Sequence, residues 1–298
     1  MNRDRIIEHF GVAFFDKIVV DLEKYAVLWC LSDFEQIDYY SVNCLFTCVS
    51  AKYGPCILKI SPHLKVTMTE YHMLKDYDGN GLCKVYEEDV VNGVLLLERI
   101  VPGIQLRDEP DLDTRLDVFC KLFCELHKPP ADKVKYPTYM DWVSRIAAYM
   151  RTRTDFKELS EKMTKAEEVC RCLWTKYIRI PTNPGGEMLL HGDLHHDNIL
   201  LSEDGYRIID PKGVVGDPVF DIPRFILNED DLEKGDNFAY IVRTLEEKLD
   251  VPEQDIRMLF YVEKCMGNSW SVEDNDEIDT DDWDGVLFAE RMMNKTSL

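Results

Sequence analysis

Several features that define other classes of protein are missing from this sequence. No run of about twenty apolar residues occurs, so no transmembrane helix is expected. The first seventeen residues carry acids and lack a small-residue cleavage site, so we expect no secretory signal and a cytosolic, cytoplasmic chain. None of the ten cysteines belongs to a CxxC pair, which gives a zinc site little support and predicts free thiols. We expect these cysteines to be buried small hydrophobes, as at Cys120 and Cys124, one helical turn apart.

Basic residues are also scarce. Lys and Arg number 35 against 56 Asp and Glu, which gives a formal net charge of -21 and a pI near 4.7. A nucleic-acid partner is not expected, because the chain has no basic footprint with which to neutralise phosphates. A field of this sign would attract polycations, although acidic proteins are also often simply soluble.

The length and hydropathy indicate a globular protein. With 298 residues, of which 45% are hydrophobic, and a mean hydropathy of -0.27, the chain can bury a substantial core. It can form one large domain or two lobes that share a cleft.

The segment Met188–Arg224 carries the clearest chemistry. A short apolar run leads into His191-Gly192-Asp193, and Asn198 follows five residues after the aspartate. A second apolar run, a turn at Ser202–Gly205 and a returning run then end at Asp210, which predicts a loop and a two-stranded hairpin. Kinase-type phosphoryl transfer uses one Asp near the attacking hydroxyl, with an Asn and a later Asp on magnesium. Asp and Asn are also ordinary turn formers, but the complete set between apolar strands favours the kinase interpretation.

Two stretches of this segment resemble a known family. HGDLHHDN is similar to the catalytic loop of the aminoglycoside phosphotransferase and choline-kinase-like superfamily. IDPKGVVGDPVFD resembles the narrower branch of aminoglycoside/hydroxyurea antibiotic-resistance kinases, which includes streptomycin 6-phosphotransferase-like enzymes. The resemblance implies an α+β, two-lobed protein-kinase-like fold. Its mainly β N-lobe would span residues 1–98, its hinge 99–103 and its mainly helical C-lobe 104–298.

The resemblance also implies a reaction and its residues. The γ-phosphoryl group of ATP or GTP would pass to a hydroxyl of a small molecule in the presence of Mg2+. Asp193 would orient and deprotonate that hydroxyl, and Asn198 and Asp210 would hold the magnesium. His191 would anchor the loop, and Asp221 would pin the backbone of the loop from a buried position.

In the N-lobe, two apolar runs flank a turn at Lys52–Pro55 and predict a hairpin. The glycine-rich GxGxxG is absent, and Ser41 and Asn43 stand where the family lets small polar residues approach the nucleotide. Alone, this signal does not separate a nucleotide loop from an ordinary hairpin.

Further along the N-lobe, Lys59 ends the second strand, and Glu70 lies on the predicted following helix. Kinase-like folds pair such residues to hold the α/β-phosphates, although a lone strand lysine is more often solvated. LLLERIVPG resembles the hinge of the family, in which Glu98 and Ile100 would contact adenine through main-chain atoms.

Helical spacing of apolar residues predicts several C-lobe helices. Their ranges are 113–127, 140–150, 156–177, 232–249 and 252–261. We interpret His127 as a packed helix-end residue, and His195 and His196 as supporting or surface groups, because magnesium prefers oxygen ligands. Lys212 is either a phosphate contact or part of a structural ion pair.

The final motif is an acidic run from Glu273 to Asp284 between Trp270 and Trp283. WSVED resembles a stretch late in the streptomycin-kinase-like branch. The run is either a disordered or solvated face, or an acidic wall suited to a guanidinium or ammonium sugar. In the second case Glu273 and Asp274 would bind a cationic acceptor.

Three functions remain open from the sequence. The first is an aminoglycoside-type resistance kinase, and the second is a housekeeping kinase for an amino sugar or choline-like alcohol. The third is a non-catalytic nucleotide-binding relative, which the intact Asp193, Asn198 and Asp210 set disfavours. Neither membrane nor nucleic acid is an expected partner.

Overall fold

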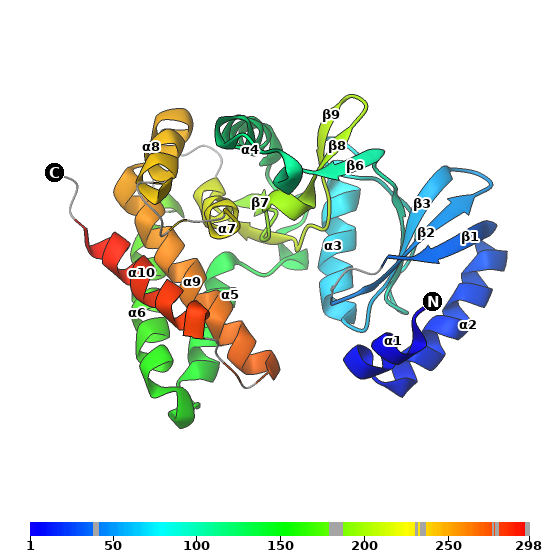
Figure 1. Cartoon of the computed structure of the whole chain (residues 1–298), viewed down its shortest axis with the longest axis horizontal. Helices are drawn as coiled ribbons and strands as arrows, with labels where there is room; N and C mark the ends of the chain where they lie inside the picture. The colour runs from blue at the N-terminus through cyan, green and yellow to red at the C-terminus, as the bar shows by residue number, and fades with distance from the viewer. Residues whose placement is uncertain are drawn as a thin grey trace. The chain divides into compact units, whose positions relative to one another are not determined.

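The computed structural model describes residues 1–37, 42–178, 187–229, 232, 237–275, 277 and 280–295, with the side chains of 275 and 280–282 left aside. Its contacts divide the chain into two compact units. Unit 1 comprises residues 1–104 and 200–210, and unit 2 comprises residues 105–199 and 211–298. Unit 1 holds the main sheet and unit 2 most of the helices, which confirms the α+β class (Figure 1).

Unit 1 is built on a five-stranded antiparallel sheet of order β1-β2-β3-β5-β4. Its strands are β1 (Leu31–Gln36), β2 (Cys44–Ser50), β3 (Gly54–Ile60), β4 (Val85–Asp89) and β5 (Val94–Glu98). Its helices are α1 (Arg3–Phe10), α2 (Val12–Leu28) and α3 (Leu64–Tyr77). The hairpin β2–β3 and the buried strand β5 agree with the sequence prediction.

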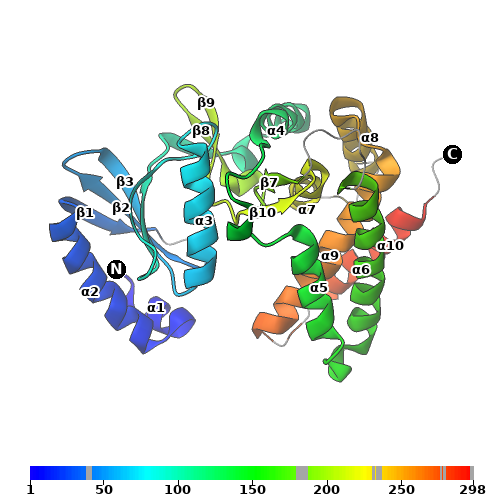
Figure 2. The same ribbon diagram turned by 180° about the vertical axis from the view of Figure 1, so that it is seen from behind.

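The two faces of this sheet carry different helices (Figure 2). Side chains alternate along a strand, so Cys56, Leu58 and Ile60 of β3 share one face and pack with residues of α1 and α2. Lys59 lies between them in sequence and points to the opposite face, where it meets Glu70 of α3. The sheet thereby separates an apolar core from a buried polar cluster.

Helix α2 was not expected from the sequence. Its buried residues Phe14, Ile18, Asp21 and Tyr25 follow helical spacing. The exposed side of the same helix also carries apolar residues, such as Val20 and Val27. Because apolar residues occur on both sides, the sequence does not reveal the helical period of the buried positions.

A second, smaller sheet includes strands from residues 200–210, which belong to unit 1. It has the order β6-β8-β9, with β6 at Pro102–Gln105, β8 at Ile199–Ser202 and β9 at Gly205–Ile208. The β8–β9 hairpin was predicted, and a parallel bridge joins Ile208 to Leu82. The sequence predicts lobes of 1–98 and 104–298 joined by a hinge at 99–103, and these bounds stay a prediction.

Unit 2 is organised around the long helix α9 (Glu253–Asn275), which packs against α5, α6, α7, α8 and α10. The other helices are α4 (Leu112–Leu126), α5 (Tyr139–Met150), α6 (Lys157–Ile178), α7 (Ile222–Leu227), α8 (Asn237–Leu249) and α10 (Thr280–Asn294). Strands β7 (Met188–Leu190) and β10 (Val214–Gly216) pair antiparallel. Short 3-10 turns are η1 (Leu106–Asp108), η2 (Lys133–Lys135), η3 (Thr154–Phe156), η4 (His196–Asn198) and η5 (Pro218–Asp221).

Three of the predicted helices, 113–127, 140–150 and 156–177, match α4, α5 and α6 within one residue at each end. The range 252–261 was too short, because α9 continues to Asn275 through the start of the acidic run. The prediction ended the helix near a Cys-Met-Gly stretch, but Gly267 continues the helix with open space beside it. Helix α8 covers Asn237–Leu249 of the predicted range 232–249, and residues 233–236 of that range lie outside the described residues.

The cysteines are free thiols, as predicted, but not all are buried. Seven are buried and three are exposed. Cys120 is buried and Cys124 is exposed, although the two lie one helical turn apart on α4. Across the parts of the chain described above, no helix is both long and apolar enough to cross a bilayer.

Candidate active site

The loop that follows β7 is held by one buried carboxylate. Asp221 accepts hydrogen bonds from the backbone N–H groups of His191 (to Oδ2) and Gly192 (to Oδ1), each at 2.7 Å. His127 Nε2 lies 3.0 Å from the same Oδ2, while His127 Nδ1 lies 2.9 Å from Phe123 O. His191 Nδ1 in turn accepts the N–H of Asp193 at 3.1 Å. These bonds fix the backbone of His191-Gly192-Asp193.

Gly192 is required at its position for two reasons. Its φ of +78° lies in the left-handed region. A Cβ atom would also lie 2.8 Å from the Trp142 ring, closer than packing permits. The indole of α5 therefore packs directly against this loop.

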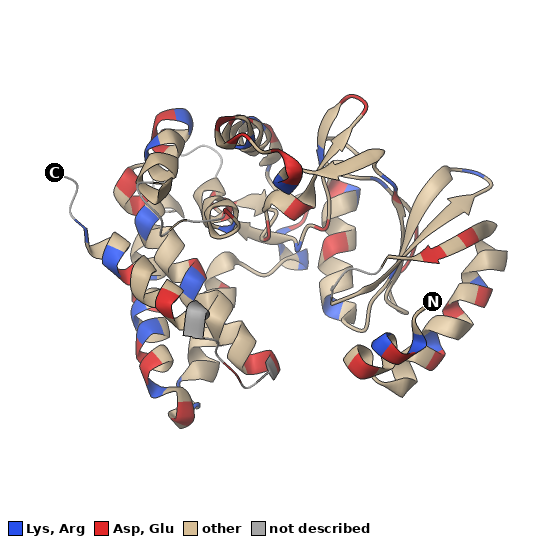
Figure 3. Cartoon of the chain, in the orientation of Figure 1, with Lys and Arg blue, Asp and Glu red and all other residues tan. Residues whose placement is uncertain are grey.

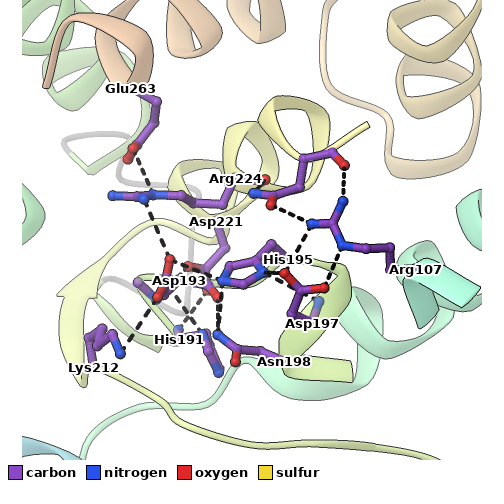
Figure 4. Close-up of polar contacts among 12 residues, drawn as sticks. Arg107, His191, Asp193, His195, Asp197, Asn198, Lys212, Asp221, Arg224 and Glu263 are labelled. Carbon is purple, nitrogen blue, oxygen red and sulfur yellow. Dashed lines mark hydrogen bonds and ion pairs between the residues drawn. The ribbon is translucent and has the colours of Figure 1, made fainter. Parts of the chain in front are cut away.

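The side chains of Arg224, Lys212 and His195 surround the carboxylate of Asp193 (Figure 4). Oδ1 lies 3.4 Å from Arg224 Nη1 and 3.7 Å from His195 Nε2, and Oδ2 lies 3.6 Å from Lys212 Nζ. Burial alone would raise the pKa of Asp193, but His195, Arg224 and Lys212 together hold it well below its usual range. Asp193 is therefore ionised, and no side-chain nitrogen lies within ordinary hydrogen-bond distance of it in these three ion pairs.

Arg224 was not singled out from the sequence. Its Nε lies 2.8 Å from Glu263 Oε2 on α9, an ion pair without hydrogen-bond geometry. Tyr139 donates to Glu263 Oε1 at 2.6 Å, and the Arg224 guanidinium lies over the Trp270 ring at 5.2 Å. No motif signals this group, because Glu263 lies 70 residues after Asp193 within an amphipathic helix.

Asn198 presents an oxygen suited to a hard cation. Its Nδ2 donates to the carbonyl of Asp193 at 2.9 Å. Only the amide nitrogen can donate, so this bond sets the orientation of the amide and turns Oδ1 away from the loop. Carboxamide oxygens of this kind are ligands that magnesium accepts.

The two neighbouring histidines differ. His195 is partly exposed, and its Nε2 lies 3.2 Å from Asn198 Nδ2. His196 is buried, stacks on Phe225 and lies 2.8 Å from Glu229 Oε1 through Nε2. Arg115 binds the same glutamate through two bonds of 2.9 and 2.6 Å, so His196 supports the loop from inside the fold.

Unit 1 contains the other set of predicted residues. Lys59 is 4% exposed, and its Nζ lies 2.7 Å from Glu70 Oε2 and also contacts Asp210 Oδ1. Burial lowers the pKa of Lys59, but the carboxylates of Asp210 and Glu70 outweigh it and raise the pKa above its ordinary value. Asp210 has a φ of 56°, which places its carboxylate on the lysine through a left-handed backbone that Asp tolerates. The predicted Lys59–Glu70 contact is thus present, with Asp210 as a third member.

The two main-chain N–H groups near the predicted adenine position differ. The Glu98 N–H donates to Lys84 O at 2.8 Å within the strand pairing. In the described part of the chain, the N–H of Ile100 forms no hydrogen bond, and the Ile100 carbonyl would lie 2.7 Å from a Cβ on Gly103. Asn43 is buried at the start of β2, and Ser41 lies outside the described residues.

Glu273 and Asp274 lie at the end of α9 rather than in a loop. Arg145 of α5 binds both carboxylate oxygens of Glu273, at 2.6 and 2.9 Å. The Trp142 and Trp270 rings meet edge to face at 6.0 Å on the same two helices. The first acid of the run is therefore paired, while acids and bases mix along α6 and α10 (Figure 3).

The arrangement of elements is that of the protein-kinase-like class. A choline kinase from Streptococcus pneumoniae (LicA) superposes with a TM-score of 0.67 at 15% identity, covering 93% of this chain and 98% of the other. The aminoglycoside phosphotransferase APH(4)-Ia gives a TM-score of 0.62 at 15% identity, covering 93% and 97%. A thermostable mutant of that enzyme has been solved with ADP and hygromycin B.

Residues 29–275 match the family described as aminoglycoside/hydroxyurea antibiotic resistance kinase, and the chain belongs to this family. Streptomycin 6-kinase of Streptomyces griseus is 28% identical over 151 residues, which are 50% of this chain and 47% of that relative. Streptomycin 3''-kinase of Klebsiella pneumoniae is 26% identical over 206 residues, covering 66% of this chain and 70% of the relative. Hydroxyurea phosphotransferase of Kitasatospora aureofaciens is 29% identical over 160 residues, covering 52% and 45%. The chain thus spans about half the length of the first of these relatives.

Proposed function

We propose that this protein is a phosphotransferase that moves the γ-phosphoryl group of ATP, or GTP, to a hydroxyl of a small molecule in a magnesium-dependent reaction. The main support for this proposal is the environment of Asp193. Its carboxylate is ionised, and it lies on a loop whose backbone is fixed by Asp221. The nitrogens of Arg224, Lys212 and His195 lie 3.4–3.7 Å from the oxygens of this carboxylate, which leaves lone pairs for the acceptor hydroxyl. Asp193 orients this hydroxyl and receives its proton as the new P–O bond forms.

The described residues fit magnesium better than a transition metal. Among them no three His, Cys, Asp or Glu side chains gather as a metal cluster. Asn198 and Asp210 each supply an oxygen, and magnesium typically completes its shell with water and substrate phosphates. When bound, the ion would neutralise charge on the phosphates of the donor.

The donor is a nucleoside triphosphate. Lys59, fixed by Glu70, binds its α/β-phosphates, and the family membership supports this role. The N–H of Ile100 and the carbonyl of Glu98 bind the base, and Ser41 and Asn43 lie beside the phosphates. The APH(4)-Ia complex with ADP supports a nucleotide donor for the fold.

The acceptor is an aminoglycoside-like cation bound through Glu273 and Asp274, a proposal supported by the streptomycin kinases among the relatives. A neutral acceptor is the second candidate. Arg145 already neutralises Glu273, and Arg224 and Lys212 place positive charge beside Asp193. A neutral hydroxyl compound avoids this repulsion.

A panel of acceptors tests the proposal. Streptomycin, hygromycin B, choline and hydroxyurea are each incubated with the protein and magnesium-ATP or magnesium-GTP, and ADP or GDP release is measured. We expect acceptor-dependent release that EDTA abolishes and that Asp193→Asn lowers by about 10²–10⁴-fold. Release with the first three alone supports the cationic site, and release with hydroxyurea alone supports the neutral one. No acceptor-dependent release with a panel widened to amino sugars would contradict the assignment.

A further inference from the structure

A buried ion pair in unit 2 has no role in the reaction as described so far. Arg224 of α7 and Glu263 of α9 lie 2.8 Å apart, and Glu263 is only 1% exposed. Burial raises the pKa of Glu263 against the opposing effects of Arg224 and of the Tyr139 hydroxyl. Such a pair is a costly way to fill a helix interface, because well-packed apolar residues are often as stable or more stable there. Stability alone therefore does not account for these two residues.

The free end of Arg224 meets Asp193. Its Nε is engaged by Glu263, its guanidinium rests over Trp270, and its Nη1 lies 3.4 Å from Asp193 Oδ1. Three contacts from different directions leave the guanidinium plane little freedom. A fixed cation on one side of a carboxylate favours one rotamer of that carboxylate.

The distance is informative as well. At 3.4 Å the contact is longer than the hydrogen bonds that arginine usually forms with carboxylates. Arg224 therefore attracts Oδ1 without occupying its lone pairs as a short bidentate bond would. That arrangement suits a carboxylate that must still receive a proton from the acceptor.

We propose that Arg224 is a positioning residue for Asp193, anchored by Glu263 and supported by the ring of Trp270. This inference rests on the proposed role of Asp193 in phosphoryl transfer. Glu263 and Trp270 both belong to α9, so the orientation of the reactive carboxylate depends on a helix that is 70 residues or more away in sequence. A misplacement of about 1 Å at a reacting group can cost about 10²-fold in rate.

The test is a double-mutant cycle on turnover with magnesium-ATP and streptomycin or hydroxyurea as acceptor. Arg224→Met should lower kcat by about 10²-fold and leave the KM for ATP within about twofold, because the donor is bound elsewhere. In the Asp193→Asn background the same change should have almost no effect, since residues that act as a unit are not additive. Arg224→Lys keeps the charge and should recover part of the loss.

Arg257→Met is the matched control. Arg257 is an arginine of α9 that, like Arg224, is paired with a glutamate and lies over an aromatic ring, here Glu253 and Phe238 at 5.4 Å. Its substitution should lower thermal stability without lowering kcat at a temperature where the variant is folded. If Arg224→Met and Asp193→Asn are additive, as structural damage would be, the positioning role is wrong.

If neither acceptor is turned over, the same double-mutant cycle can be measured on the equilibrium of unfolding in denaturant. If the wild-type protein turns over no acceptor of the widened panel, the proposed function is contradicted. The unfolding cycle, in contrast, tests the role of Arg224 alone. The effect of Arg224→Met on the unfolding equilibrium should differ at least about fivefold between the Asp193 and Asp193→Asn backgrounds. Equal effects in the two backgrounds would show that Arg224 does not act on Asp193 and would overturn the proposal.

Discussion

The buried lysine of unit 1 and the reactive aspartate of unit 2 are stabilised in opposite ways. Lys59 contacts two carboxylates directly, with Glu70 Oε2 only 2.7 Å from its Nζ. Asp193 faces Arg224, Lys212 and His195, and the nearest of their nitrogens is 3.4 Å away. Both side chains keep their charge, but only Lys59 has short contacts with groups of opposite charge.

The difference in contact distance separates Lys59, which has a proposed role in binding, from Asp193, which has a proposed role in the reaction. Short contacts with two carboxylates fix Lys59 in one position. Longer contacts around Asp193 stabilise its charge while its lone pairs remain open to another molecule. The following predictions test this comparison.

The largest effect is expected at Asp193. Asp193→Ala should reduce phosphoryl transfer by about 10²–10⁴-fold, because orientation and proton acceptance are lost together. Calorimetric titration with magnesium-ATP should show nucleotide binding within a few-fold of wild type. Near-normal turnover would remove Asp193 from the mechanism.

Lys59→Met should mainly affect stability and donor binding. It leaves Glu70 and Asp210 without their buried counter-charge, so the free energy of unfolding should fall by about 3–5 kcal/mol. Lys157→Met, which breaks an exposed pair with Glu161, is the control and should cost at most about 1 kcal/mol. Urea titrations of both variants measure this, and equal losses would contradict the distinction drawn for Lys59.

Glu229 shows what short donors do to a carboxylate in unit 2. Burial would raise its pKa, but His196 and Arg115 lower it from 4.5 to about 2. The stabilisation is therefore present above about pH 4.5 and is lost as the pH falls toward 2. It amounts to about 3 kcal/mol. Glu229→Gln should flatten the acid branch of the stability curve between those pH values, and an unchanged branch would contradict the lowered pKa.

Asp210→Asn should change the demand for metal. The variant keeps its shape but loses a charged oxygen, so half-maximal activity should need about 10–100-fold more magnesium. Activity measured against magnesium concentration at fixed ATP tests this. The same magnesium dependence in both proteins would remove Asp210 from the metal site.

The smallest effect concerns the acceptor. Glu273→Gln with Asp274→Asn should raise the KM for streptomycin but not for ATP, by an amount that corresponds to about 0–1 kcal/mol for each exposed charge. The effect should weaken as salt shortens the screening length to about 8 Å. Arg145→Gln frees Glu273 and should act in the opposite direction. No response in either variant at low salt would favour the neutral acceptor.

The sequence predicted the parts of the fold and site that depend on local pattern. The loop from His191 to Asn198 and the hairpin to Asp210 combine apolar runs with turn residues, and the structure contains both. The contact of Lys59 with Glu70 was also predicted, because a strand followed by a helix limits where the two can meet.

The missed features depend on tertiary contacts. Glu263 is one acid among many on a long helix, and only packing brings it to Arg224. Similarly, the pairing of Arg145 with Glu273 joins residues 128 apart, so the acidic run looked unpaired in sequence. Residues 200–210 join unit 1 through the β6–β8 pairing, the contact of Asp210 with Lys59 and the bridge at Ile208, which no local pattern reveals.

The accessibility of the cysteine thiols can be used to follow the unfolding of each unit. Three cysteines, Cys30, Cys124 and Cys172, are open to alkylating reagents in the folded protein. The protected thiols of unit 1 are Cys44, Cys48, Cys56 and Cys83, and those of unit 2 are Cys120, Cys170 and Cys265. Pulsed alkylation followed by peptide mass analysis would therefore show, without any added label, which unit opens first as denaturant is raised.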